Sequence, residues 1–169
     1  TRLRNDLEAA FPHWEKAKDI IDASIDVMLN VSQSGHPGGS RSKVHALLAG
    51  ILSGAMRFDF RNPMRPLADR LILVAGHCTP LVYSTLALVN ESLRLRHAAT
   101  GDDRYAHAED ENLVLTLRDL AGFRRRGGLP GHVEMAGKTM WLKSCTGPSG
   151  HGMPAAVGQA LALKHGGAD

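Results

Sequence analysis

The sequence is poor in cysteine and lacks any long hydrophobic run. Its 169 residues contain only two cysteines, Cys78 and Cys145, which suits a reducing compartment and excludes a disulfide framework. No stretch approaches the roughly 18 consecutive apolar residues of a membrane-spanning helix, and residues 1–5 do not begin a signal peptide. We therefore predict a cytoplasmic protein with no membrane partner.

The sequence also lacks a strong excess of positive or negative charge. The formal net charge is only +3, and Arg124-Arg125-Arg126 is the only tight basic run. Nucleic-acid-binding proteins gather Lys and Arg on one face, so this scattered pattern argues against a nucleic-acid partner. With 43% hydrophobic and 22% charged residues, the chain has the composition of one ordinary globular domain.

Hydrophobic periodicity predicts two helices in the first third of the chain. Apolar residues fall on one helical face over residues 14–31, before a turn at Ser34-Gly35. A second helix is expected to begin at Ser40 or Ser42, which would act as its N-cap. Its inward-facing residues would be Val44, Leu47, Leu48, Ile51 and Ala55.

A strand and a further helix are predicted on either side of Gly76-His77. Residues 71–74 form a continuous apolar run, which is typical of a strand buried on both faces. The polar residues 97–112 predict a surface excursion, and residues 113–123 predict a helical segment. The helix after Gly76-His77 would align Val82, Leu86, Val89 and Leu93 on one face.

A last helix is predicted over residues 151–165, and Gly166-Gly167 would end it. This helix would carry Met153, Val157 and Leu161 on one face. A strand that feeds a helix through a short glycine-containing turn is typical of α/β architecture. The chain is therefore predicted to be an α/β domain.

Glycine and histidine are concentrated in four short loops. Glycine beside an imidazole, or beside a run of backbone N–H groups, lets polar groups approach an anionic ligand without obstruction by side chains. Ligands of open α/β sheets lie at the carboxyl ends of the strands, and the last loop leads into a helix N-terminus that favours negative charge. The loops are Ser34-Gly35-His36-Pro37-Gly38, Gly76-His77, Leu129-Pro130-Gly131-His132 and Thr146-Gly147-Pro148-Ser149-Gly150-His151-Gly152.

In this order, the four loops resemble those of the transketolase family of thiamine-diphosphate enzymes. Asp69-Arg70 before the apolar run and Glu134 after His132 also agree with the family pattern. The resemblance covers about residues 14–168. It implies a thiamine-diphosphate-binding fold with a parallel sheet flanked by helices. Residues 1–169 would be the N-terminal part of the diphosphate-binding domain, and this α/β fold would be incomplete, with the second domain absent from the chain.

The resemblance also implies roles for particular residues. His77 would contact the cofactor diphosphate. His36 and His132 would be catalytic, binding the hydroxyl and carbonyl oxygens of the sugar and moving protons. The Gly147 carbonyl would accept a hydrogen bond from the aminopyrimidine, which Pro148 and Ser149 would help to hold. Two departures, Ser149 and His151 in place of the family's usual Leu and Gln, make this part of the site more polar.

The implied reaction is transfer of a two-carbon ketol unit from a ketose to an aldose, with a sugar or sugar phosphate as substrate. Family members ligate magnesium through residues that would lie beyond Asp169, and a glutamate of the second domain activates the cofactor. The chain begins without methionine, so we expect a trimmed piece or a split subunit. It would work as a homodimer or with a chain carrying the missing domain, and would be inactive alone.

Other interpretations remain open at this point. A homodimeric pyruvate dehydrogenase E1-like or a phosphoketolase-like enzyme would share the Gly-His and the glycine turn, and a non-catalytic cofactor-binding subunit would too. Zinc bound by His36, His77 and His132 would make a metallohydrolase, although their spacing matches no common zinc motif. Each histidine could also be a solvated turn residue, and this is our interpretation of His151.

Overall fold

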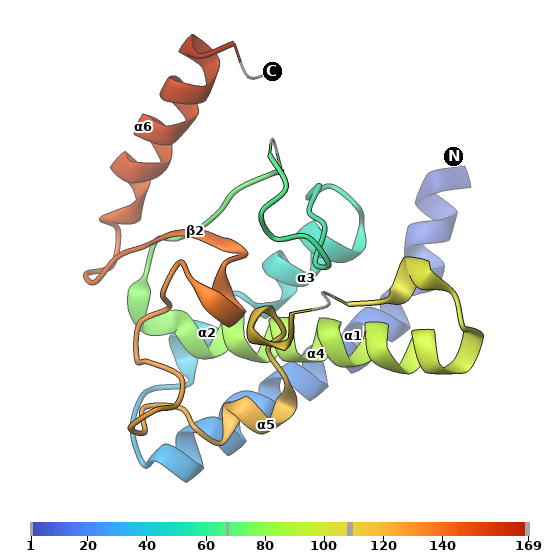
Figure 1. Ribbon diagram of the computed structural model, residues 1–169, viewed down its shortest axis with the longest axis horizontal. Coiled ribbons are helices and arrows are strands. Elements are labelled where there is room, and N and C mark those ends of the chain that lie inside the picture. The colour runs from blue at the N-terminus through green and yellow to red at the C-terminus, as the bar shows by residue number, and fades with distance from the viewer. Residues whose placement is uncertain (1, 67, 108–109, 168–169) are drawn as a thin grey trace.

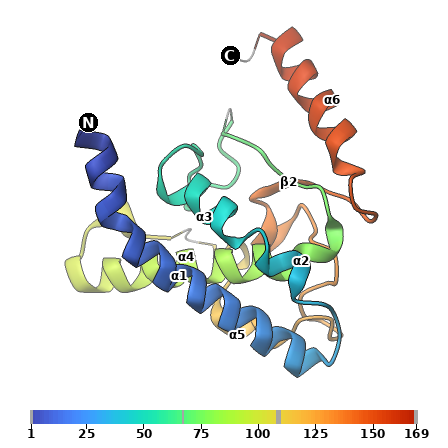
Figure 2. The same ribbon diagram turned by 180° about the vertical axis from the view of Figure 1, so that it is seen from behind.

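The structure is a computed structural model that describes residues 2–66, 68–107 and 110–167. Figures 1 and 2 show two long crossing helices below a small sheet, with the last helix extending away from the remaining helices. The α-helices are α1 (Arg2–Ser32), α2 (Gly38–Arg41), α3 (Val44–Leu52), α4 (Thr79–Thr100), α5 (Leu117–Leu120) and α6 (Gly152–His165). The strands are β1 (Leu71–Leu73) and β2 (Leu142–Cys145).

Helix α1 confirms the first predicted helix and begins earlier, at Arg2. Ile21, Ile25 and Met28 recur at helical spacing, and all three side chains are fully buried. They lie where α1 packs against α3 and α4, and Figure 2 shows α1 crossing in front of α4. The predicted periodicity of residues 14–31 therefore marks the face of α1 that builds the core.

Helix α4 forms the centre of the fold. Every residue from Thr79 to Ala87 is buried, and Pro80 lies in the first turn, where its missing N–H leaves no bond unmade. Gly101 ends the helix in the left-handed conformation, with φ of +63°. The helix therefore extends to Thr100, so the first residues of the predicted 97–112 excursion are helical. Residues 108–109 of that excursion lie outside the described residues.

The second predicted helix is split into α2 and α3. Its predicted N-caps are wrong, because Lys43 occupies the N-cap of α3. The Ser42 hydroxyl donates to the Gly39 carbonyl, which is a local bond that competes with a continuous helix. Ala55 is exposed beyond the end of α3, so its predicted inward position is also wrong.

A parallel pair of strands joins two distant parts of the chain. Leu71 pairs with Leu142, and Leu73 pairs with Cys145. The apolar run predicts β1, but β2 is not predicted, because Lys143 and Ser144 interrupt its apolar pattern. Only Leu73 of β1 is buried, whereas Leu71 and Ile72 are half-buried, so the predicted strand that is buried on both faces is not found. The described chain is thus an incomplete α/β fold, helix-rich with a small parallel sheet.

The predicted helical segment near residues 113–123 shrinks to one turn, α5. Val114 and Leu115 precede it as buried, non-helical chain. A capping box begins α5, because Asp119 accepts bonds from both the Thr116 backbone N–H and its hydroxyl. Lys138 donates to the same carboxylate from the later turn at Gly137–Thr139. Burial alone would raise the pKa of Asp119, but the bonds from Lys138 and Thr116 outweigh it and lower this pKa.

Helix α6 contacts the sheet rather than the helical core. Gly166 follows the helix and Gly167 adopts φ of +72°, which confirms the predicted glycine ending. Its apolar face is exposed, with about half or more of the Met153, Val157 and Leu161 side chains accessible. Within the described ranges, no helix is both long and apolar enough to cross a membrane.

Candidate active site

Three of the four predicted loops meet at one end of the parallel sheet, and the loop that contains His36 leads to them through α2. Strands β1 and β2 run in the same direction, so the chain leaves both of them at the same edge. Gly76-His77 follows β1 after two residues, and Thr146 directly follows β2. Residues far apart in sequence are brought together here.

Gly76 marks the closest approach among these loops. A Cβ atom at Gly76 would lie 1.6 Å from the Thr146 carbonyl oxygen and 2.5 Å from Cδ2 of His132. Both distances are far below any real contact, so only glycine can occupy this position. The Gly76-His77 loop therefore packs directly on the His132 loop and on the loop that follows β2.

The loop that contains His36 leads into α2, which packs against His77. A Cβ atom at Gly39 would lie 3.2 Å from Nε2 of His77 and 3.0 Å from the Cys78 thiol. The Lys43 ammonium donates to the Gly39 carbonyl at 2.7 Å and lies 3.7 Å from the Cys78 sulfur. A glycine backbone and a cation thus lie beside the exposed imidazole of His77.

The His132 loop is held by two hydroxyl groups of α4. The Thr79 hydroxyl donates to the Gly131 carbonyl at 3.0 Å, and the Tyr83 hydroxyl donates to the Pro130 carbonyl at 2.9 Å. Burial raises the pKa of Tyr83 well above its ordinary value, with smaller contributions from Cys145 and Glu134. The phenol therefore stays a hydrogen-bond donor, and it fixes the backbone that presents the exposed side chain of His132.

The loop after β2 is attached to the end of β1. The Gly150 N–H and the Thr146 hydroxyl both donate to the Val74 carbonyl, at 3.1 and 3.2 Å. A Cβ atom at Gly152 would lie 2.6 Å from the Cα atom of Val74, so the first turn of α6 needs glycine there. These bonds leave residues 147–149 on the surface of the loop, and all three are exposed.

The predicted site residues thus lie on neighbouring loops, but their imidazoles do not bond to one another. His36, His77 and His132 are all exposed, and His151 is an exposed residue at the N-cap of α6, as predicted. Over residues 2–66, 68–107 and 110–167, no three His, Cys, Asp or Glu side chains gather to hold a metal ion. The zinc interpretation therefore finds no support in the described residues.

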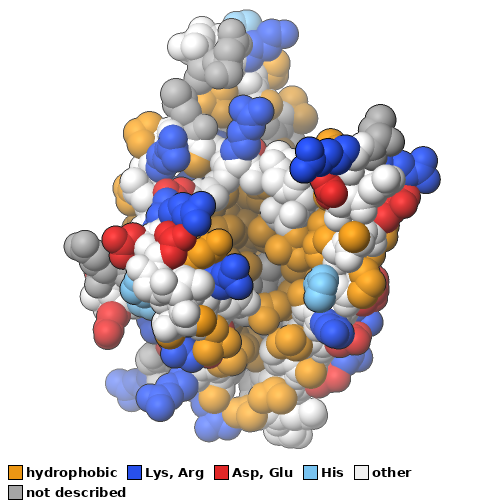
Figure 3. Space-filling model, turned by 90° about the vertical axis from the view of Figure 1, so that its right-hand side faces the viewer, with side chains coloured by type: hydrophobic (Ala, Val, Ile, Leu, Met, Phe, Trp, Pro, Cys, Tyr) orange, Lys and Arg blue, Asp and Glu red, His pale blue; other side chains and the backbone are white. Residues whose placement is uncertain are grey.

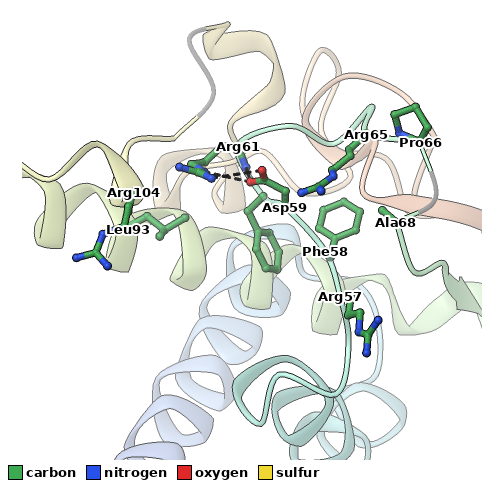
Figure 4. A pocket seen from close by; sticks show the side chains of 10 residues that line it. Arg57, Phe58, Asp59, Arg61, Arg65, Pro66, Ala68, Leu93 and Arg104 are labelled. Atoms are coloured by element: carbon green, nitrogen blue, oxygen red, sulfur yellow. Dashed lines mark hydrogen bonds and ion pairs between the residues drawn. The ribbon is translucent and has the colours of Figure 1, made fainter.

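Other hollows lie away from these loops. A cavity of about 710 Å³ is lined by Arg57, Phe58, Asp59, Phe60, Arg61, Arg65, Pro66, Ala68, Leu93 and Arg104 (Figure 4). Asp59 pairs with Arg61 at 3.1 Å, and Arg104 pairs with Asp102 at 2.6 Å. Burial would raise the pKa of Asp59, but Arg61 outweighs it and lowers this pKa. Arg61 and Arg104 are thus bound by carboxylates of the protein itself.

An apolar groove opens between α1, α3 and α4. Hydrophobic side chains gather around a hollow on the face seen in Figure 3. The groove measures about 480 Å³, and its lining includes Ala17, Leu48, Ile51, Leu88, Leu93 and Tyr105. It lies on the helical core rather than at the sheet edge, so it is separate from the histidine loops.

Three contacts at the site were missed by sequence reasoning. Lys43 beside Cys78, Thr79 on the His132 loop and Arg124 on Ser34 join residues 35 to 90 positions apart. No local pattern predicts such contacts, because they depend on how α1, α2 and α4 pack.

Comparison with curated proteins finds transketolases. The transketolase of Bacillus subtilis (strain 168) is 34% identical over 146 residues, which are 84% of this chain and 18% of that protein. The transketolase of Rhodobacter capsulatus is 31% identical over 153 residues, which are 90% of this chain and 19% of that protein. The chain belongs to the transketolase family. It spans about a fifth of the length of these relatives.

A shorter relative is also found. The 6-deoxy-6-sulfo-D-fructose transketolase subunit SqwG of Clostridium sp. (strain MSTE9) is 35% identical over 131 residues. These residues are 77% of this chain and 38% of that subunit. No family model and no solved structure matches the chain.

The close approach at Gly76 gives a first prediction. Gly76→Ala would force the loops apart, and we expect a loss of about 3 kcal/mol or more in the free energy of unfolding, measured with urea. Gly50→Ala is the control, because a Cβ atom there meets no atom within 4 Å in helix α3. It should be stabilising by roughly 0.5–1 kcal/mol. Equal stabilities for both variants would contradict the described packing.

The Tyr83 bond gives a second prediction. Tyr83→Phe removes the donor to Pro130 and should lower the free energy of unfolding by about 1–2 kcal/mol at pH 7. Because the pKa of Tyr83 is raised in the folded state, its stabilisation is fully present below about pH 10 and is lost as the pH rises further. Urea unfolding at rising pH should therefore show a shallower alkaline decline for Tyr83→Phe than for the wild type. Parallel declines would contradict this assignment.

Proposed function

We propose that this chain forms the histidine-bearing part of a thiamine-diphosphate site for ketol transfer. The observation that carries the proposal is the contact of Gly76 with both Thr146 and His132, which unites loops from three parts of the chain. The reaction would move a two-carbon ketol unit from a ketose to an aldose. Residues 1–169 would be the N-terminal part of the diphosphate-binding domain.

The chemistry of the loops fits this cofactor. His77 is exposed beside the backbone of Gly39 and the ammonium of Lys43, which suits a diphosphate that needs donors and positive charge. A Cβ atom at Gly147 would meet no atom within 4 Å, so the loop leaves room for a flat ring beside its backbone. The Gly147 carbonyl, with Pro148 and Ser149, would hold the aminopyrimidine there. When bound, the cofactor supplies the carbanion chemistry.

The exposed imidazoles of His36 and His132 would act on the sugar. Both can donate to, or accept from, the hydroxyl and carbonyl oxygens of a ketose. Imidazole can also give and take protons at neutral pH, as cleavage of a carbon–carbon bond in a ketose requires. These two residues are the proposed acid–base groups, and the substrate would be a sugar or a sugar phosphate.

The remaining parts of the site would come from elsewhere. The chain matches about a fifth of its longer relatives, and one relative bears the name of a subunit. We place the magnesium ligands and the cofactor-activating glutamate beyond Asp169, or on a second polypeptide. The working enzyme would then be a homodimer or a complex with that polypeptide. The free thiols of this chain, Cys78 and Cys145, suit a protein of the reducing cytoplasm.

The test uses the intact protein, together with any polypeptide that copurifies, in the presence of Mg²⁺. We expect calorimetry to detect thiamine diphosphate binding, and His77→Ala should weaken it by about tenfold or more, as loss of a charge-assisted bond requires. In a ketol-transfer assay, His36→Ala and His132→Ala should each lower kcat by about 10²–10⁴-fold.

His45→Ala is the matched control for these variants. Its imidazole bonds to Glu15 on the surface of α1, away from the sheet edge. The control should leave cofactor affinity and kcat unchanged. Absence of cofactor binding in the wild type, or full kcat in His36→Ala and His132→Ala, would overturn the proposal.

A further inference from the structure

Two consecutive arginines join the turn after α5 to the end of α1. Arg124 donates through Nη1 to the Ser34 hydroxyl at 2.5 Å. Arg125 donates through Nη2 to the Val31 carbonyl at 2.8 Å. Val31 and Ser34 lie just before His36, while the turn itself leads to His132. The two histidine loops are therefore linked by side chains as well as through the sheet edge.

The backbone at Arg124 is unusual. Its φ is +56°, a left-handed conformation that glycine adopts freely and that arginine rarely adopts. The Arg124 N–H donates to the Leu129 carbonyl at 2.7 Å, which closes the turn and holds this conformation. A strained residue that the surrounding structure keeps in place points to a role for its side chain.

The guanidinium of Arg124 reaches both loops at once. A Cβ atom at Gly131 would lie 3.0 Å from its Nε atom, and one at Gly35 would lie 4.0 Å from its Nη1 atom. Gly131 and Gly35 are the residues directly before His132 and His36. The planar, five-donor guanidinium thus lies between the two backbones that present these imidazoles.

We propose that Arg124 is a positioning residue that sets the spacing of the His36 and His132 loops. The proposal rests on the proposed function, because it assigns both histidines to one sugar substrate. Catalytic groups must be held near their productive geometry, and a displacement of about 1 Å can cost about 10²-fold in rate. Arg124 acts through the two loops and donates to Ser34, and it is distinct from the acid–base groups themselves.

The first test is independent of any activity. Arg124→Gly removes the guanidinium and keeps the backbone N–H in a conformation that glycine tolerates. We expect the NMR order parameters of the Gly35, His36, Gly131 and His132 amides to fall from about 0.85 toward about 0.6. Arg126→Ala is the control, because this exposed side chain makes no hydrogen bond in the described part of the chain. Unchanged order parameters in Arg124→Gly would overturn the proposal.

The second test follows catalysis in the intact protein. Arg124→Gly should lower kcat by about 10²-fold with a much smaller change in KM, and millimolar guanidinium should restore part of the rate. Arg124→Lys keeps the charge but loses the planar fork, so it should recover less than half of kcat. A purely structural residue would lower unfolding stability and leave the kcat of folded enzyme unchanged, which would overturn the proposal.

The two tests separate the failure of this inference from failure of the proposed function. If both loops lose order in Arg124→Gly but the wild type shows no ketol transfer, then Arg124 links the two loops and the proposed function is wrong. If ketol transfer depends on His36 and His132 but not on Arg124, then the proposed function stands and the positioning role of Arg124 is wrong. Ser34→Ala should repeat the loss of order on the His36 side, because it removes the acceptor of the Arg124 bond.

Discussion

The contact between the ends of the two strands is the constraint on which the remaining structure depends. Parallel pairing brings Gly76 and Thr146 to one edge, and the absence of a side chain at Gly76 lets the Thr146 carbonyl and the His132 ring approach it. With any larger residue there, the loops could not pack together. The bonds from Gly150 and Thr146 to Val74 then hold the start of α6 against the same edge.

Buried residues hold the loops of this site in place, whereas the side chains that could act on a ligand are exposed. Thr79 and Tyr83 are buried, and their hydroxyls hold backbone carbonyls rather than ligands. His36, His77 and His132 are exposed on the loops that these contacts support. A scaffold that positions exposed imidazoles is what acid–base chemistry on a polar substrate requires.

The sequence predicts the loops and the main helices, because their signals are local. Helical periodicity identifies α1, and the apolar run identifies β1. Strand β2 is missed because Lys143 and Ser144 break its pattern, and the exposed face of α6 could not be foreseen from its spacing. The Arg124–Ser34 bond spans 90 residues, so only the packed structure brings its partners together. Contacts that depend on tertiary packing are therefore not predicted by local sequence patterns.

The most direct test of the account follows the nine histidines individually by NMR, with ¹³C-labelled imidazoles, while thiamine diphosphate and Mg²⁺ are added. We expect saturable shifts at His36, His77 and His132, with little change at His13, His45 and His165. Shifts confined to histidines away from the sheet edge, or no saturable shift at these three, would contradict a single cofactor site formed by the converging loops.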